Sequence, residues 1–149
     1  QPEPPASQTP LAQVFTASSG AFRTLGTKLL AGREFDERDT KEAPRVLIVN
    51  QTFTTNILQV KNPAEAVGKR VRSRSRVWEI AGVVEDGKYL ALAEAPKPVM
   101  FFAASQDYTS IMRLVARTQG DERELLNRVR SLIIEMEPDM AIYSAETLE

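Results

Sequence analysis

Runs of hydrophobic residues along this chain of 149 residues predict short strands that alternate with helices. The clearest strand is 45–50, where four consecutive aliphatic residues indicate burial on both faces of a sheet. Asn50 is suited to cap a helix over about 51–59, in which Phe53 and Ile57 lie four residues apart on one face.

The other predicted strands are short and bounded by turn residues. They are expected at 11–16, at 99–103, at 111–117, at 140–143 and as two arms of a hairpin within 71–84 that turns near 73–75, while 29–32 forms a strand or a turn. A short helix through Phe22 and Leu25 is expected to be capped by Ser18 or Ser19 and ended by Gly26.

The last third of the chain has the most regular pattern. Its apolar positions follow the helical period: Leu125, Leu126, Val129, Leu132, Ile133 and Met136. Asp121 and Glu124 have the spacing of a capping box, and Pro138 stops the helix. A strand–helix–strand unit is predicted here, and the whole pattern indicates an α+β fold.

Composition narrows the functions that are open to the chain. It contains no Cys and no His, which excludes a thiolate nucleophile, a Cys/His zinc site and a Ser-His-Asp triad. The formal net charge of −1 argues against binding nucleic acid by bulk electrostatics. Residues 1–10 carry four of the nine prolines and are predicted to be an extended linker. Because the chain opens with Gln1 rather than Met, we expect it to be a piece of a longer protein.

A basic cluster within the predicted hairpin is the strongest candidate for binding. It consists of Lys69, Arg70, Arg72, Arg74 and Arg76, followed by Trp78. Strand alternation is expected to place the four arginines on one face, opposite Val71, Ser73 and Ser75. This pattern is typical of a solvated hairpin edge, and it also permits contact with a phosphate, a lipid headgroup or a partner.

Two acidic segments carry side chains that could bind a cation or transfer a proton. The run of Glu34, Asp36, Glu37 and Asp39 could hold a hard cation, but interspersed basic residues favour a salt-bridged surface turn. The segment 85–89 places Asp86, Lys88 and Tyr89 close enough in sequence for proton transfer, although a turn is the simpler interpretation. Neither segment makes a catalytic or cofactor-binding constellation.

Short motifs follow one another along the chain in a characteristic order. They are FRTLG (22–26), LLAGREF (29–35), APRVLIVN (43–50), GKRV (68–71), IAGVVEDGKY (80–89), EAPKPVM (94–100), RTQGD (117–121) and EPD (137–139). From about residue 14 to the end, this series resembles the periplasmic core domain of MacB-type ABC transporter permeases, within the FtsX-like permease superfamily. It is most similar to the acidobacterial-type permeases that lack a fused ATPase.

The resemblance implies a non-catalytic periplasmic domain of an inner-membrane permease, without cofactor or metal. Such a domain passes conformational change or engages substrate or partner proteins. It implies a core domain over 11–149 in which 11–27 and 108–149 build a mixed α/β lobe and 28–107 an inserted β-rich lobe. The implied partners are the transmembrane helices of the permease, a separate ATPase subunit and periplasmic proteins, with no nucleic acid, and the isolated piece is expected to be a monomer.

Two other functions stay open on the sequence alone. The first is a soluble module that holds an anionic ligand through the hairpin 69–76. The second is an acid–base enzyme that uses Asp86, Lys88 and Tyr89.

Overall fold

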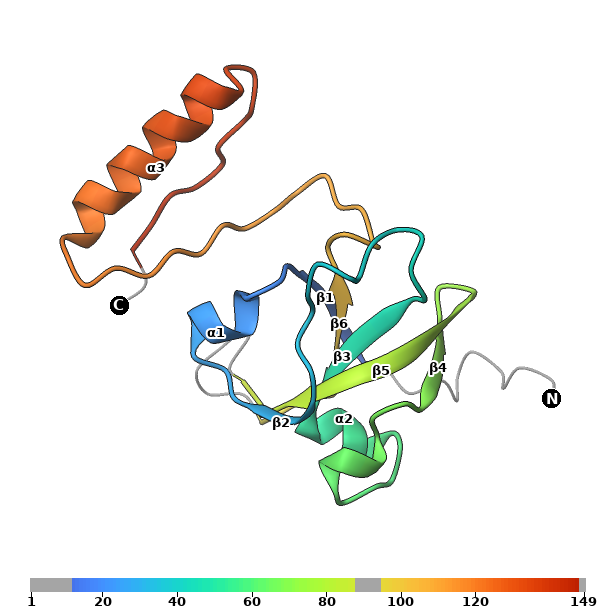
Figure 1. Cartoon of the computed structure of the whole chain (residues 1–149). Helices are drawn as coiled ribbons and strands as arrows, with labels where there is room; N and C mark the ends of the chain where they lie inside the picture. The colour runs from blue at the N-terminus through green and yellow to red at the C-terminus, as the bar shows by residue number, and fades with distance from the viewer. Residues whose placement is uncertain (1–11, 88–94, 148–149) are drawn as a thin grey trace. The chain divides into compact units, whose positions relative to one another are not determined.

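The chain is described by a computed structural model over residues 12–87 and 95–147, and it divides into two compact units between Val115 and Ala116. Within the described residues, the first unit holds a mixed β-sheet with short helices and the second holds one long helix (Figure 1). The predicted α+β class is therefore confirmed.

The sheet of the first unit has six strands among the described residues. They are β1 (Gln13–Ala17), β2 (Leu29–Gly32), β3 (Val46–Asn50), β4 (Arg70–Ser73), β5 (Arg76–Val84) and β6 (Val99–Ala103). The strand order is β1-β6-β3-β5-β2, and β4 pairs with β5. Strand β6 is parallel to β1 and antiparallel to β3, whereas β5 is parallel to β3 and antiparallel to β2 and β4. All five residues of β3 are buried, as its apolar run predicts.

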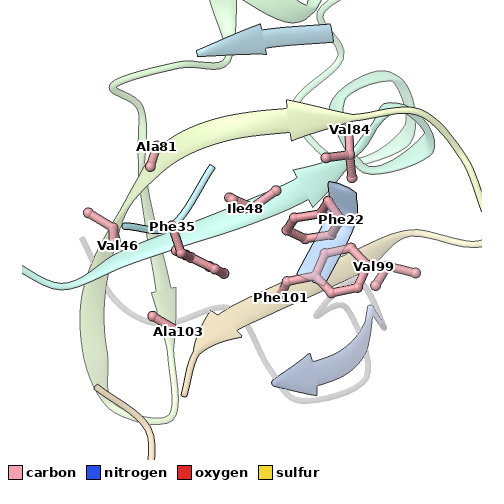
Figure 2. Close-up of a cluster of buried hydrophobic side chains, with 9 residues drawn as sticks. All are labelled: Phe22, Phe35, Val46, Ile48, Ala81, Val84, Val99, Phe101 and Ala103. Atoms are coloured by element: carbon pink, nitrogen blue, oxygen red, sulfur yellow. The ribbon is translucent and has the colours of Figure 1, made fainter. Parts of the chain in front are cut away.

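One face of the sheet is covered by aromatic side chains from connecting segments (Figure 2). Phe22 of α1 (Ala21–Leu25) and Phe35 of the following loop pack with Phe101 of β6. The Phe22 and Phe101 rings meet edge to face, with centroids 4.9 Å apart. Burial of each such ring stabilises the fold by about 1.5–3 kcal/mol.

The opposite face is covered by α2 (Gln51–Asn56) and the segment that includes the 3-10 turn η2 (Pro63–Glu65). Phe53 of α2 joins the same cluster as Trp78 of β5 and Phe102 of β6. The Trp78 and Phe102 rings lie edge to face with centroids 4.5 Å apart. This aromatic pair supports the basic surface described below.

Strand β1 draws together two segments that the predicted lobes separate. It comes from 11–27, and it pairs in register with β6 from 28–107, from Gln13 opposite Val99 to Ala17 opposite Ala103.

Two helix boundaries differ from the sequence prediction. The N-cap of α1 is Gly20, in a left-handed conformation at φ 77°, and neither Ser18 nor Ser19 caps the helix. Helix α2 ends at Asn56 rather than about 59, because Gln59 adopts a left-handed φ of 56° and the Val60 N–H donates to the Thr54 carbonyl. In both places backbone turn geometry overrides the side-chain pattern.

The second unit contains α3 (Glu122–Met136), whose N-cap is Asp121 as predicted. The Asp121 Oδ1 accepts a hydrogen bond from the Glu124 N–H at 2.8 Å. No residue of α3 is buried.

The strands predicted at 111–117 and 140–143 are wrong, because neither segment pairs with another strand in the described part of the chain. Ile111, Met112 and Leu114 are about 70% exposed. An apolar run becomes a strand only where a sheet edge accepts it, so pairing decides the outcome rather than local pattern.

Candidate functional site

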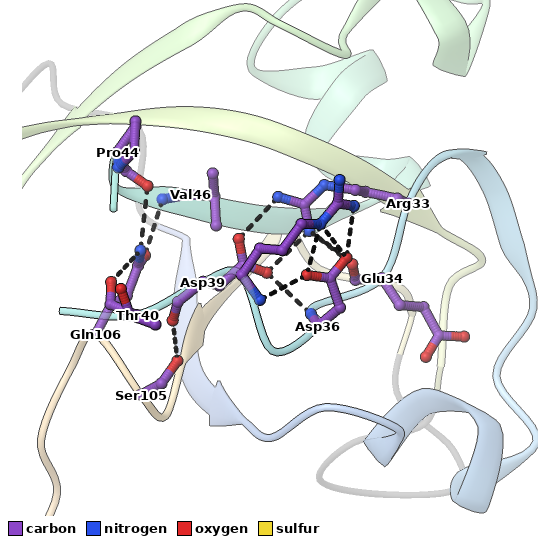
Figure 3. Close-up of polar contacts among 10 residues, drawn as sticks. Arg33, Glu34, Asp36, Asp39, Thr40, Pro44, Val46, Ser105 and Gln106 are labelled. Atoms are coloured by element: carbon purple, nitrogen blue, oxygen red, sulfur yellow. Dashed lines mark hydrogen bonds and ion pairs between the residues drawn. The ribbon is translucent and has the colours of Figure 1, made fainter. Parts of the chain in front are cut away.

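The loop 33–45, between β2 and β3, is fastened by a buried carboxylate (Figure 3). The Arg33 guanidinium donates to both oxygens of Asp39, at 2.8 and 2.7 Å, and the Asp36 N–H donates to Asp39 Oδ2 at 2.9 Å. Only 3% of the Asp39 side chain is exposed, against 36% of Arg33. Because hydrogen bonds from Arg33 stabilise its charged form, the pKa of Asp39 lies below its usual value.

The outer part of the same loop carries a second ion pair. Arg38 binds the Asp36 carboxylate with a shortest distance of 2.7 Å, and this lowers the pKa of Asp36. Arginines therefore engage two of the four acidic residues of the run 34–39. The predicted salt-bridged surface turn is confirmed for Asp36 and Asp39.

Residues that follow β6 tie this loop to the sheet. The Gln106 amide donates to the carbonyls of Thr40 and Pro44, and its oxygen accepts from the Val46 N–H, at distances of 3.0–3.1 Å (Figure 3). Ser105 Oγ donates to the Asp39 carbonyl. Gln106 is buried, so its bonds replace the water that these backbone groups would otherwise need.

A cavity of about 200 Å³ lies between loop 33–45 and the ends of two strands. Its lining combines Phe35 and alanines with hydroxyl and carboxylate groups: Ala17, Ser18, Ser19, Phe35, Asp36, Glu37, Asp39, Thr40, Ala103, Ala104 and Ser105. The buried Asp39 carboxylate is occupied by Arg33, so the cavity presents no activated acid or base from it.

A second polar cluster joins the ends of β3, β5 and β6. The buried Asn50 amide donates to Asp86 Oδ1 at 2.7 Å and to the Lys97 carbonyl at 2.8 Å. Its oxygen accepts from the Phe53 and Val99 N–H groups, so Asn50 caps α2 as predicted.

Asp86 completes that cluster by accepting from the backbone and the hydroxyl of Thr52, at 2.9 and 2.8 Å. The Asp86 carboxylate, which the sequence offers as a candidate acid–base residue, is thus held by three hydrogen-bond donors at the start of α2. Lys88 and Tyr89, its suggested partners, lie outside the described residues.

The basic hairpin does not place its four arginines on one face, so that prediction is wrong. Arg74 and Ser75 form a two-residue turn, both with positive φ, so the strand register restarts at Arg76 opposite Ser73. Arg70 and Arg72 share one face, whereas Arg76 lies on the face of Ser73 and Trp78. The predicted anion or partner contact by Lys69 and these arginines stays a prediction.

Two guanidinium groups rest on the buried aromatic pair. The Arg45 Cζ lies 5.3 Å from the centre of the Trp78 ring, and the Arg74 Cζ lies 5.0 Å from that of Phe102. Arg74 also pairs with Asp107 at 2.6 Å. Sequence reasoning missed Arg45, although its spacing of two from Leu47 signals the same sheet face as Trp78.

The chain is therefore an α+β domain. Hydrogen bonds from polar side chains fix its loops, and two arginines lie over a buried aromatic pair. The profile of the MacB-like periplasmic core domain family matches residues 4–144, so the chain belongs to this family. It is accordingly a periplasmic, extracytoplasmic domain of the transporter permease type. The predicted family and location are confirmed.

One solved structure agrees at the level of the fold. The chain is similar to the periplasmic region of MacB from Actinobacillus actinomycetemcomitans, with a TM-score of 0.61 and 19% identity over 84% of this chain and 56% of that one. It also matches a domain assigned to a permease protein from Porphyromonas gingivalis, with a TM-score of 0.45 and 17% identity over 80% of this chain and 58% of that one. The chain thus spans little more than half the length of either. No curated protein matches it by sequence.

None of the described helices combines the length and apolar character that crossing a membrane requires.

Proposed function

We propose that this domain performs no chemistry and passes conformational change between an ABC-type permease and the periplasm, where it engages substrate or partner proteins. Its direct partners are the transmembrane helices of the permease, and a separate ATPase subunit supplies the motion. ATP hydrolysis takes place on that subunit and not on this domain.

The observation that supports this proposal is the use of one buried and one half-buried carboxylate to fix the backbone. Asp39 fixes loop 33–45 through Arg33, and Asp86 fixes the start of α2 through Thr52. Three donors hold each carboxylate, and Arg33 engages both oxygens of Asp39 where that residue borders the cavity. Fastened loops on a buried sheet move as one body, which suits a part that transmits displacement.

The test uses the complete permease together with its ATPase in proteoliposomes. Replacement of residues 12–147 by a Gly/Ser linker is expected to abolish transport while ATP hydrolysis by the ATPase continues. Membrane insertion and ATPase binding of the linker variant are the controls. Full transport by a correctly inserted linker variant would contradict the proposal.

The division into two lobes, 11–27 with 108–149 and 28–107, belongs to the same proposal. It is supported by the exposed apolar side chains of the C-terminal segment, among them Ile111, Met112 and Tyr143, which call for a packing partner in the parent protein. Chemical cross-linking in the full permease tests it. Cross-links between 11–27 and 108–149 are expected, and cross-links from 108–149 to other segments only would contradict it.

A further inference from the structure

Two arginines lie over the rings of Trp78 and Phe102, and a third lies on the same sheet face as Trp78, two residues before it. We propose that Arg45, Arg74 and Arg76 form a binding site for a phosphate group. The site lies where β3 and β5 begin and β6 ends, and it is independent of the transmission role proposed above.

The arginines are positioned by the aromatic rings beneath them. Trp78 and Phe102 are buried, and the Arg45 and Arg74 guanidinium groups lie over their rings at 5.3 and 5.0 Å. A guanidinium that stacks on a ring leaves the N–H donors at its edge free to bind oxygen, and its conformational freedom is already reduced. The cost of ordering these side chains on binding is thereby lowered.

Strand register adds the third arginine to the same face. Arg76 lies opposite Ser73 and two residues before Trp78, so its side chain leaves the strand on the same face as Trp78. It is exposed and has no ionic partner among the described residues. Arg76 therefore keeps its donors available.

The local charge favours a phosphate over a single carboxylate. Arg74 pairs with Asp107 at 2.6 Å, whereas Arg45 makes only a long bond of 3.4 Å to the Gln106 carbonyl. Glu79 lies on the other face of the strand, opposite Arg70. The three arginines thus carry three positive charges against the one negative charge of Asp107, which only Arg74 contacts, and a phosphate group carrying close to two negative charges matches the remainder.

Phosphate chemistry can come from a free phosphate or from a lipid headgroup. Both present the tetrahedral oxygens that arginine binds in a fork, and both fit an exposed site. The two sources differ in whether the domain must lie at a membrane surface, so separate arms of the experiment distinguish them.

The chain contains one tryptophan, and it lies directly beneath Arg45. Fluorescence of Trp78 therefore reports on the site. Inorganic phosphate is titrated into the 149-residue chain against chloride at matched ionic strength, and cosedimentation is measured with phosphatidylcholine vesicles with and without phosphatidic acid, whose headgroup is a phosphomonoester. A saturable change that phosphate alone produces assigns a free phosphate, and binding to phosphatidic acid vesicles alone assigns a headgroup.

Matched variants test the residues. Arg45→Gln and Arg76→Gln are each expected to weaken binding about fivefold to tenfold, and Arg76→Lys to restore part of it. Arg23→Gln removes an equal charge from exposed α1 and is expected to bind as the unaltered chain does. If Arg45→Gln fails to fold, the exposed Arg76→Gln carries the test. The proposal is overturned if neither arm shows binding, if Arg23→Gln weakens it equally, or if an acidic peptide binds and phosphate does not.

Discussion

At the scale of single residues, the buried carboxylate of Asp39 fixes loop 33–45. Asp39→Asn keeps the size of the side chain but removes the two-pronged ion pair with Arg33, which retains only a longer contact of 3.4 Å to Asp36. Because Arg33 is partly exposed, water recovers some of that loss. The free energy of unfolding, measured with urea, is expected to fall by about 2–3 kcal/mol. Glu37→Gln, an exposed change in the same loop, is the control and is expected to shift it by less than about 0.5 kcal/mol.

The same carboxylate makes stability depend on pH. Its pKa is lowered in the folded state, so its contribution is full above the unfolded pKa near 3.9 and is lost as pH falls through the folded pKa. Urea midpoints measured from pH 7 to pH 2 are expected to drop less steeply below about pH 4 in Asp39→Asn than in the unaltered chain. Urea midpoints that fall equally steeply below about pH 4 in both proteins would show that folding does not lower the pKa of Asp39.

Asn50 joins the ends of three strands through one amide. Asn50→Ala leaves the buried Phe53 and Val99 N–H groups without that partner, and it also removes the donor to the part-buried Lys97 carbonyl. The free energy of unfolding is expected to fall by about 3 kcal/mol or more, measured by thermal and urea unfolding. Asn56→Ala, at an exposed position of the neighbouring helix, is the control. An equal loss in both variants would argue against the special role of Asn50.

At the scale of elements, the hairpin of β4 and β5 has a turn that its sequence does not favour. Arg74 and Ser75 have φ of 52° and 61°, a conformation that non-glycine residues adopt at a cost. Ser75→Gly is expected to raise the free energy of unfolding by about 0.5–1 kcal/mol, measured with urea. Ser73→Gly, in the adjoining strand, is the control and is expected to lower it. A loss of stability in Ser75→Gly would contradict the turn geometry.

Elements that depend on neighbouring residues in the sequence were predictable. The buried strand β3, the Asn50 cap of α2 and the Asp121 cap of α3 all follow from local patterns, and the structure has each of them. The sheet face on which each arginine lies was not predictable, because a two-residue turn resets the alternation. The strand predictions at 111–117 and 140–143 are wrong for a related reason, since a strand needs an edge that no local pattern reveals.

The candidate sites show the same limit. The charged run 34–39 predicted ion pairs because its acids and bases are adjacent in the sequence. The support that Gln106 gives to loop 33–45 joins residues sixty or more positions apart, and so does the bond from Ser105 to Asp39. Contacts at that separation follow from the order of strands in the sheet, with β6 beside β3, which the sequence pattern does not specify.

At the scale of the whole molecule, the two units differ in how much each of them buries. Every residue of β3 and β6 is buried, whereas α3 has none that is, and amide protection depends on the free energy needed to expose each backbone bond. Amides of α3 are therefore expected to exchange at least about 100-fold faster than those of β3 in hydrogen-exchange mass spectrometry of the chain.

A cap variant separates the stabilities of the two units. Asp121→Ala removes the hydrogen bond to the Glu124 N–H and costs α3 about 1 kcal/mol, which corresponds to about fivefold faster exchange in that helix. Protection of β3 and β6 is expected to stay unchanged, because no bond of the sheet passes through Asp121. Faster exchange in β3 as well would mean that the units unfold together. Exchange confined to α3 would mean that the two units unfold independently.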